Sequence, residues 1–557
     1  MFFERILIRD LTSIPRWFYL ERQLLSTQLV RIESFKYQAL ANYFCTGRDQ
    51  LLSTLKSVEM HEYNRKACLA KTRLDVIKSI LDWIADESSD RKSVLWLYGL
   101  AGSGKSTLST TIAWMMRELH RLGAFFFFDR DIPERNATTL ITMLAYQLAQ
   151  FDPRIGAKVS QIVENIPGIA AMPLDFQFTN LLSATALKSV QWSEGPIILV
   201  IDGLDECGNE TDRKVLMKAL SKCFSDLPSF LRVVLVSRPE FDIEDTLTAH
   251  PAVYSYSLDI GSVTTREDIS EFLRYRFSEI RETTKRPHLP PDWPGKNRIS
   301  ALIERAGGLF VWASTACLYI ESYAPDYRLN ELVTQQSAVT TSGPFANLDR
   351  LYKTGLQSAG SWGDSLFRTD CCNILGAILC VKTPLSYSAI DSLLALPRPC
   401  LWSISRLGCV LRGGETEAVR ILHPSFHDYL SRRCSAEPWS INLELHNETL
   451  AVHCVEFLDN TLRQNICGLT LPHPVGKETL PEAVSYACKF WVEHVCLISH
   501  STDTIGDQIY EFLGRHLLHW MEALAVIKSH NTTIRSLQNL LEWLQVCCPT
   551  CLLHDCS

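Results

Sequence analysis

A glycine-rich stretch ending in Lys-Ser-Thr is the part of the sequence best suited to chemistry. It fits the pattern G-x-x-x-x-G-K-[ST] at every fixed position and directly follows the apolar run 94–98. Glycines let backbone N–H groups curl around phosphate oxygens, Lys105 would reach the β- and γ-phosphates, and Ser106 would ligate Mg²⁺. We therefore predict a nucleotide phosphate site made of Gly99, Leu100, Ala101, Gly102, Ser103, Gly104, Lys105, Ser106 and Thr107.

A second candidate is an acidic group that follows the apolar run 196–201. Asp202 stands where a strand is expected to end, at the edge of an open α/β sheet that binds ligands. From there it is suited to hold Mg²⁺ through the metal's water shell. Asp205 or Glu206, a few residues further on, would polarise an attacking water. The sequence thus predicts a metal and hydrolysis site about a hundred residues after the phosphate loop.

Three further residues are candidates for nucleotide contacts. Arg238 follows the apolar run 231–236 and is predicted to sense the γ-phosphate with its guanidinium fork. Thr72 and Arg73 come just before a strongly periodic helix upstream of the phosphate loop. A helix in that position commonly borders the nucleotide base, so we predict that both residues contact the adenine side.

The elements that must position these residues form an α/β pattern. Continuous apolar runs of this kind suit a parallel sheet that is covered on both faces, and helical segments separate them. A capping box at Thr264–Glu267 predicts the start of a helix over 266–280, whereas 151–193 is expected to be a polar connection with a helix only near 178–190. The fold class is therefore α/β, with a doubly wound P-loop NTPase (AAA+-like) parallel sheet. The predicted strands are 94–98, 123–128, 196–201, 231–236 and 253–258, and further predicted helices are 105–120 and 137–150.

Composition limits the class of protein and its partners. The 557 residues are too many for one core, and a net charge of −7 without a long basic run gives no support for a nucleic-acid partner. Charges within the first ten residues argue against a signal peptide, so we predict a cytoplasmic protein. The longest uncharged apolar stretch, Ala306–Ile320, is too short for a membrane span and predicts a buried helix.

The second half of the chain contains few chemical motifs. A linker is expected at 335–347, and the pattern helix, strand, helix over 401–430 suits a winged-helix unit. From 444 to 546 the sequence is almost entirely amphipathic helix. The C-terminal group Cys548, Cys551, His554 and Cys556 offers four potential zinc ligands, but its spacing favours an ordinary cysteine-rich tail over a metal site.

With these pieces placed, the sequence resembles the NACHT family of STAND-class signalling ATPases, most closely the fungal branch. The resemblance covers about 65–546 and leaves the first 60 residues unmatched. The stretches that carry it are Gly99–Thr107, Ile198–Cys207, Val236–Glu240, Gly307–Phe310 and His423–Leu430.

The resemblance implies a nucleotide switch. In such proteins the core, a small helical domain and a winged helix close over ADP, and the winged-helix His, here His423, contacts the ADP phosphate. Exchange for ATP permits self-association and signalling, in this case in innate defence or incompatibility, with the protein trigger and effector unknown. We accordingly expect ATP/ADP and Mg²⁺ as cofactors. The expected domains are an N-terminal helical extension at 1–60, the NACHT nucleotide-binding domain at 61–280, a small helical domain with linker at 281–347, a winged-helix-like domain at 348–440 and a C-terminal helical domain at 441–557.

Two departures from the family pattern leave alternatives open. Phe310 stands where plant and animal relatives usually have Pro, and neither an N-terminal effector nor a C-terminal repeat array is evident. The chain is thus either a slow ATPase switch or a nucleotide-locked scaffold, and it could be a truncated NACHT adaptor or an incomplete gene product. A P-loop kinase for a small molecule is a third class, which the winged-helix-like segment disfavours. The absence of an Asn-Lys-x-Asp motif favours ATP over GTP.

Overall fold

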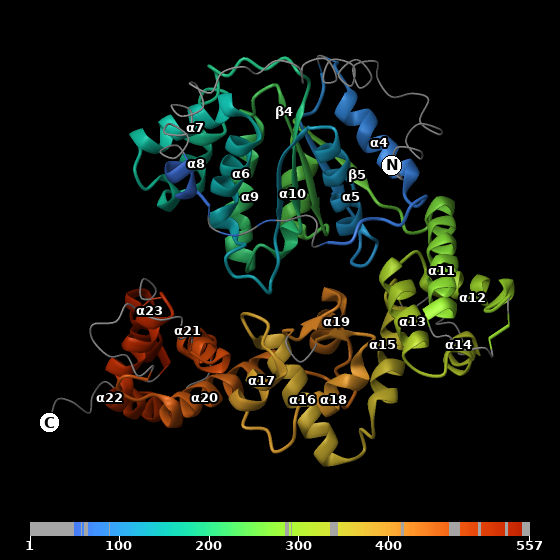
Figure 1. Ribbon diagram of the computed structural model, residues 1–557, viewed down its shortest axis with the longest axis vertical. Coiled ribbons are helices and arrows are strands. Elements are labelled where there is room, and N and C mark those ends of the chain that lie inside the picture. The colour runs from blue at the N-terminus through green and yellow to red at the C-terminus, as the bar shows by residue number, and fades with distance from the viewer. Residues whose placement is uncertain are drawn as a thin grey trace, which may run out of the picture.

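The computed structural model describes most of the chain from residue 49 onward. The described residues are 49–56, 58, 60, 65–88, 90–283, 289–290, 292–334, 343–413, 417–466, 480–498, 503–529 and 533–547. A sheet flanked by helices forms one half of the molecule, and a row of helices from α11 to α23 forms the other, with α19 reaching towards the sheet (Figure 1).

Five parallel strands form the sheet, in the order β2-β3-β4-β1-β5. Their buried residues form near-continuous apolar runs, as expected for strands covered on both faces. The predicted α/β fold is confirmed, and each strand lies within one residue of its expected limits. The strands are β1 (Val94–Tyr98), β2 (Leu122–Phe127), β3 (Ile197–Asp202), β4 (Leu231–Ser237) and β5 (Val253–Ser257).

Helices cover the two faces of the sheet with two separate cores. Alternate strand residues such as Leu95 and Leu97 pack against α4 (Leu74–Ala85) and α5 (Lys105–Glu118). Their neighbours, such as Trp96, pack on the opposite face. That face is covered by α6 (Ala137–Phe151), α7 (Pro153–Asn165), α8 (Leu174–Leu181), α9 (Glu210–Phe224) and α10 (Phe241–Thr248).

Two local expectations for this half were wrong. The stretch expected as a connection contains α7, which begins at an N-cap where Asp152 accepts hydrogen bonds from the N–H groups of Arg154 and Ile155, with Pro153 in its first turn. The helix expected near 178–190 is α8 and ends at Leu181.

The capping box was also displaced by two residues. Helix α11 spans Val263–Thr283, so Thr264 lies inside the helix, and the Thr265 N–H donates to the Ser262 hydroxyl at 3.1 Å. Ser262 is therefore the residue that caps α11.

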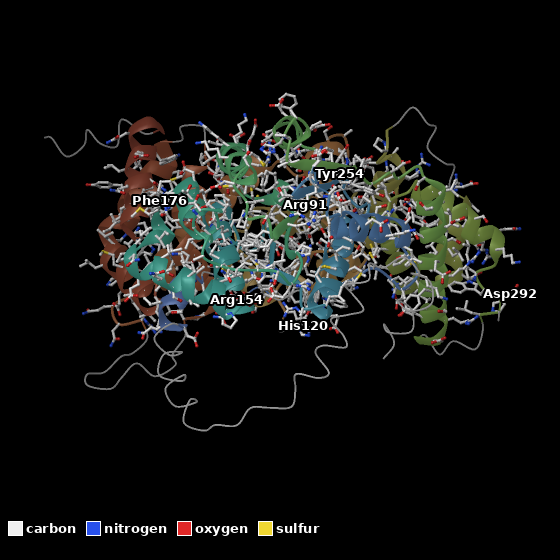
Figure 2. The ribbon with its side chains drawn as sticks, turned by 90° about the horizontal axis from the view of Figure 1, so that it is seen from above. Arg91, His120, Arg154, Phe176, Tyr254 and Asp292 are labelled. Carbon is white, nitrogen blue, oxygen red and sulfur yellow. The ribbon has the colours of Figure 1, made fainter. Side chains whose placement is uncertain are left out.

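A small helical unit follows the sheet. It comprises α11, α12 (Lys296–Ala306), α13 (Phe310–Ser322) and α14 (Pro325–Thr334). The apolar face of α11 packs in the same core as α12 and α13. The expected domain boundary at 281 stays a prediction. In Figure 2, Asp292 of this unit lies at the opposite end of the molecule from Arg154 and Phe176, which belong to α7 and α8.

A helical unit with a small two-stranded sheet comes next. The antiparallel pair β6 (Leu411–Arg412) and β7 (Arg420–Ile421) lies between the helices and α19 (Pro424–Asp428). The preceding helices are α15 (Ala346–Ala359), α16 (Ser365–Cys380), α17 (Tyr387–Leu393) and α18 (Leu401–Ile404), and a π-helix follows at Tyr429–Arg433. Over 401–430, where the sequence predicts helix, strand and helix, the structure has α18, the β6–β7 pair and α19. We call this part of the chain the winged-helix unit after that prediction, and its assignment as a winged helix stays a prediction.

The last described part is all helical, as expected, and comprises α20 (Leu443–Thr461), α21 (Glu482–Cys496), α22 (Asp503–Val526) and α23 (Thr533–Cys547). Among the described helices, none is long and apolar enough to cross a membrane. Most of the expected N-terminal extension and the cysteine group at 548–556 lie outside the described residues.

Candidate functional site

The strand order brings the three candidate stretches together. β3, β4 and β1 are neighbours, and all three are parallel, so the residues that follow them meet at one edge of the sheet. The phosphate loop follows β1, Asp202 ends β3, and Arg238 follows β4. This edge is where open α/β sheets bind their ligands.

The phosphate loop has the backbone that its glycines permit. Gly102 and Gly104 have φ angles of 80° and 93°, a region that other residues avoid. Gly104 is the N-cap of α5, whose first N–H groups and dipole favour an anion at this position. The Thr107 hydroxyl donates to the Gly104 carbonyl at 2.7 Å and stabilises the first turn.

Lys105 is folded against its own loop. Its Nζ donates to the Gly99 and Leu100 carbonyls at 2.8 and 2.9 Å. Burial lowers the pKa of Lys105 to about 8, although the nearby Asp205 carboxylate opposes the shift. An anion in the loop would favour the charged ammonium. Lys105 would then exchange its carbonyl partners for phosphate oxygens.

Ser106 and Asp202 form a pair of hard oxygen ligands. Their Oγ and Oδ1 atoms lie 3.4 Å apart, and Asp202 is only 1% exposed. The other carboxylate oxygen, Oδ2, is buried without a hydrogen-bond partner among the described residues. Mg²⁺ prefers oxygen ligands and often binds proteins through one or two side chains, so these two residues fit the predicted metal.

Glu206 has an environment that opposes its charged form. Burial raises its pKa to about 8, and the adjacent Asp205 carboxylate adds to the shift. Asp205 itself is engaged, because one of its oxygens accepts the Arg238 backbone N–H at 2.9 Å. In this arrangement Glu206 is largely protonated at neutral pH, so only a minor fraction is in the form that can act as a base.

Arg238 joins two parts of the chain. Its Nε lies 3.2 Å from Asp205 Oδ2, and its Nη1 donates to Asp428 Oδ2 of α19 at 2.7 Å. All three side chains are largely buried, with exposures of 16% or less. The predicted γ-phosphate sensor is therefore held between the sheet and the winged-helix unit.

His423 also faces the phosphate loop from the winged-helix unit. A Cβ built on Gly102 would lie 3.8 Å from His423 Cε1. Burial, together with Arg238 and Lys105, lowers the pKa of His423 to about 3, so the ring is neutral. Because Nδ1 accepts the Ser425 N–H at 3.1 Å, the proton lies on Nε2, which is available to donate to an oxygen.

The small helical unit approaches the loop from the other side. The Val311 N–H donates to the Gly102 carbonyl at 3.1 Å, and a Cβ on Gly104 would lie 3.6 Å from the Phe310 ring. Phe310, which replaces the expected proline, lies over the Arg73 guanidinium at 4.9 Å from the ring centroid.

Thr72 and Arg73 are buried beside the loop, but their side chains bond protein atoms. The Thr72 hydroxyl donates to the Leu69 carbonyl at 2.7 Å. The Arg73 guanidinium donates to the Ser103 carbonyl and the Thr265 hydroxyl at 2.7 and 2.8 Å. The predicted contacts to the base remain a prediction, and for Arg73 they would have to come from atoms other than these donors.

Sequence reasoning missed three residues of this site. Asp428 stands in a stretch that the resemblance had marked and Val311 directly follows another, but no role could be assigned to either without the contact between units. Arg65, whose Nη1 lies 2.8 Å from Asp202 Oδ2, gave no motif at all. The only signal in the sequence was that Arg65 is a basic residue a few positions before the candidate pair Thr72 and Arg73.

A phosphate loop after β1 and a buried carboxylate at the end of β3, in a five-stranded parallel sheet, define a P-loop NTPase core. In agreement, residues 76–238 match the family model described as Nephrocystin 3, N-terminal (NPHP3_N). This match covers less than a third of the chain and includes the phosphate loop, Asp202, Glu206 and Arg238. A search of curated proteins finds no significant match.

Solved structures with a similar arrangement are distant in sequence. A Signal Transduction ATPase with Numerous Domains (STAND) protein with a tetratricopeptide repeat sensor from Pyrococcus horikoshii is 12% identical, with a TM-score of 0.41, over 87% of this chain. The chain spans 59% of that protein's length.

Two DNA-bound structures are also similar. The Aeropyrum pernix ORC1 protein is 13% identical with a TM-score of 0.28, over 68% of this chain and 94% of its own. Drosophila ORC is 13% identical with a TM-score of 0.23, over 94% of this chain and 78% of its own. None of the three scores is high enough to support a functional argument.

Proposed function

We propose that the chain is an ATP/ADP-dependent switch, in which bound nucleotide controls self-association and signalling. The observation that supports this most is the convergence of two other units on the P-loop core. Val311 bonds the loop itself, His423 faces it, and Asp428 binds Arg238. A ligand that contacts all of these groups would hold the units together.

Different residues around the core would bind different parts of the nucleotide and its metal. The loop N–H groups and Lys105 would hold the phosphates, and Ser106 and Asp202 would hold Mg²⁺, which neutralises phosphate charge when bound. His423 Nε2–H would donate to a phosphate oxygen as a neutral group. Each of these interactions favours the closed arrangement, and a thousandfold excess of nucleotide over its Kd would stabilise it by about 4 kcal/mol.

Exchange of ADP for ATP would act on Arg238. A γ-phosphate competes with Asp428 for the same guanidinium, because both are anions that accept its N–H groups. A ligand shifts an equilibrium only by its differential affinity for the two states. In this proposal the competition for Arg238 is the source of that difference, and it weakens the contact with the winged-helix unit.

The protonation state of Glu206 indicates that hydrolysis is slow in the closed arrangement. A carboxyl group with a pKa of about 8 is mostly protonated at neutral pH, so only its minor deprotonated fraction accepts a proton from water. The same observation favours a second candidate, a nucleotide-locked scaffold that does not hydrolyse ATP at all. Whether the switch acts in defence is a hypothesis that rests on the resemblance to NACHT proteins alone.

The test is the identity and amount of nucleotide released by heat from the freshly purified chain, measured by anion-exchange chromatography. We expect close to one ADP per chain, and none from Lys105→Ala, which removes the phosphate-binding ammonium. Lys214→Ala removes an exposed lysine of α9 that pairs with Glu210, and serves as the control that keeps its nucleotide. Equal nucleotide content in wild type and Lys105→Ala would refute the site, and an empty wild-type chain that also fails to bind added ADP or ATP would refute the proposed function.

A further inference from the structure

An arginine that precedes α4 contacts the predicted metal-binding carboxylate. Arg65 Nη1 lies 2.8 Å from Asp202 Oδ2, and the two side chains are 25% and 2% exposed. Asp202, the last residue of a buried strand, therefore has a counter-charge. An unpaired charge at this depth would be costly, and Arg65 supplies the opposite charge.

The contact between the two residues is one of charge rather than of a directed hydrogen bond. Neither Arg65 Nη1 nor Asp202 Oδ2 has a hydrogen-bond partner among the described residues, in spite of the short distance between them. The second carboxylate oxygen is within reach of the Ser106 hydroxyl. A ligand that offers Oδ2 a better-aligned partner, such as a metal-bound water, can thus replace the guanidinium.

Arg65 is held in this position by its surroundings. Its guanidinium lies 4.5 Å from the centroid of the Phe127 ring, and Phe127 is paired in register with Asp202 on the neighbouring strand. The segment that follows is fixed to α5, because the Cys68 N–H donates to Thr111 Oγ1 at 2.9 Å. The arginine therefore belongs to an ordered part of the chain.

We propose that Arg65 is the built-in counter-cation of the metal site and that it competes with Mg²⁺ for Asp202. This inference rests on the proposed nucleotide site. A guanidinium and a dication cannot both lie against one carboxylate without strong repulsion in a partly buried site. Nucleotide without metal leaves the Arg65–Asp202 pair intact, whereas Mg²⁺ must displace it. Arg65 therefore lowers the affinity for Mg²⁺ and favours nucleotide bound without metal.

The experiment is a titration of fluorescent ADP binding to the full chain, first in chelator and then at increasing Mg²⁺. We expect Arg65→Gln to lower the Mg²⁺ concentration at the midpoint roughly three- to tenfold, the scale of one lost charge competitor. In chelator, the affinity of Arg65→Gln for ADP should be equal to that of the wild-type chain or lower. The matched control is Arg135→Gln, since Arg135 lies over the same Phe127 ring at 3.9 Å but is paired with Asp129 instead.

The outcomes separate this inference from the proposed function. A midpoint lowered in Arg65→Gln but not in Arg135→Gln supports the competition. Equal midpoints in wild type and Arg65→Gln, with ADP binding intact, overturn this inference alone. A midpoint that falls equally in both variants also overturns it, because the effect would then be one of general charge. Failure of the wild-type chain to bind ADP at any Mg²⁺ concentration overturns both proposals.

Discussion

At the scale of single residues, the state of one carboxyl group decides whether the site can hydrolyse ATP. Glu206 sits beside Asp205 in a buried position, and both burial and its neighbour's charge favour the protonated form. Its pKa of about 8 compares with an ordinary value of 4.5. Between these values the folded chain holds a proton that the unfolded chain has lost, so the contribution of this group to folding stability is lost as the pH rises through that range.

The pH dependence of turnover tests this assignment. ATP hydrolysis by the wild-type chain should rise with pH and level off above about 8, because only deprotonated Glu206 accepts a proton from water. Glu206→Gln should bind nucleotide as before and lose roughly 100-fold or more in kcat, the usual contribution of a general base.

A nearby carboxylate provides the control for Glu206. Glu210 stands at the start of α9, exposed and paired with Lys214, so Glu210→Gln should leave both rate and pH profile unchanged. A residual rate in Glu206→Gln with the same pH profile as wild type would show that another group is responsible for the titration.

At the scale of elements, the fit between the phosphate loop and α13 depends on the absence of a side chain at Gly102. A Cβ at this position would lie 2.1 Å from Val311 Cγ1, too close for either group to remain in place. Gly168 has nearly the same φ angle, 79° against 80°, but nothing lies within 4 Å of its Cβ position. Substitutions at both positions would strain the backbone, but only a substitution at Gly102 would also clash with another element. Comparing the two therefore separates these effects.

We predict that Gly102→Ala destabilises the nucleotide-free chain more than Gly168→Ala does. The strain at positive φ costs roughly 1–2 kcal/mol in each variant, and the clash with Val311 adds about 1–3 kcal/mol at Gly102 alone. Hydrogen exchange of the first turn of α13 should speed up only in Gly102→Ala, and the thermal midpoint should fall further. Val311→Ala, added to Gly102→Ala, should restore part of the loss. Equal effects at both glycines would mean that α13 does not press on the loop.

The sequence predicts the sheet and the core of the site because both are local patterns. One apolar run and the carboxylate that ends it predict strand β3 and Asp202. Nine consecutive residues predict the phosphate loop. The order of the strands then brings these stretches to one edge. The same reasoning explains why the fold class was predictable while the ends of individual helices were not.

Contacts between distant parts of the chain were not predictable from local patterns. Asp428 and Arg238 are 190 residues apart, and nothing in either stretch shows that they pair. Arg65 has no motif around it. Helix α7 was missed for another reason, since its Asp-Pro start resembles a loop, although an acidic N-cap followed by Pro is also a common way to begin a helix.

At the scale of the whole molecule, the ion pair between Arg238 and Asp428 links the sheet to the winged-helix unit. Arg238 contacts Asp205 on its own side and Asp428 across the junction, so loss of Asp428 removes the link and leaves the core pair in place. Phe426 and Tyr352 are buried in an extensive apolar core and pack edge to face, so the core of the winged-helix unit is built from residues other than the linking pair.

We predict that Asp428→Asn opens the closed arrangement without unfolding the units. Breaking a largely buried ion pair by neutralising one partner typically costs about 3 kcal/mol or more, which is enough to change the ratio of closed to open chains by two orders of magnitude. The radius of gyration from small-angle X-ray scattering should increase, bound ADP should dissociate faster, and the chain should self-associate more readily.

The control for this prediction is an ion pair within the winged-helix unit itself. Asp349 of α15 pairs with Arg433 at 2.9 Å, with exposures of 25% and 24%, so Asp349→Asn weakens the unit without touching the junction. It should lower the thermal midpoint and leave the radius of gyration and the ADP off-rate unchanged. If both variants expand the molecule equally, the expansion arises from general destabilisation. If neither does, the link between Arg238 and Asp428 does not hold the two units together, and the control of closure must lie with Val311 and His423.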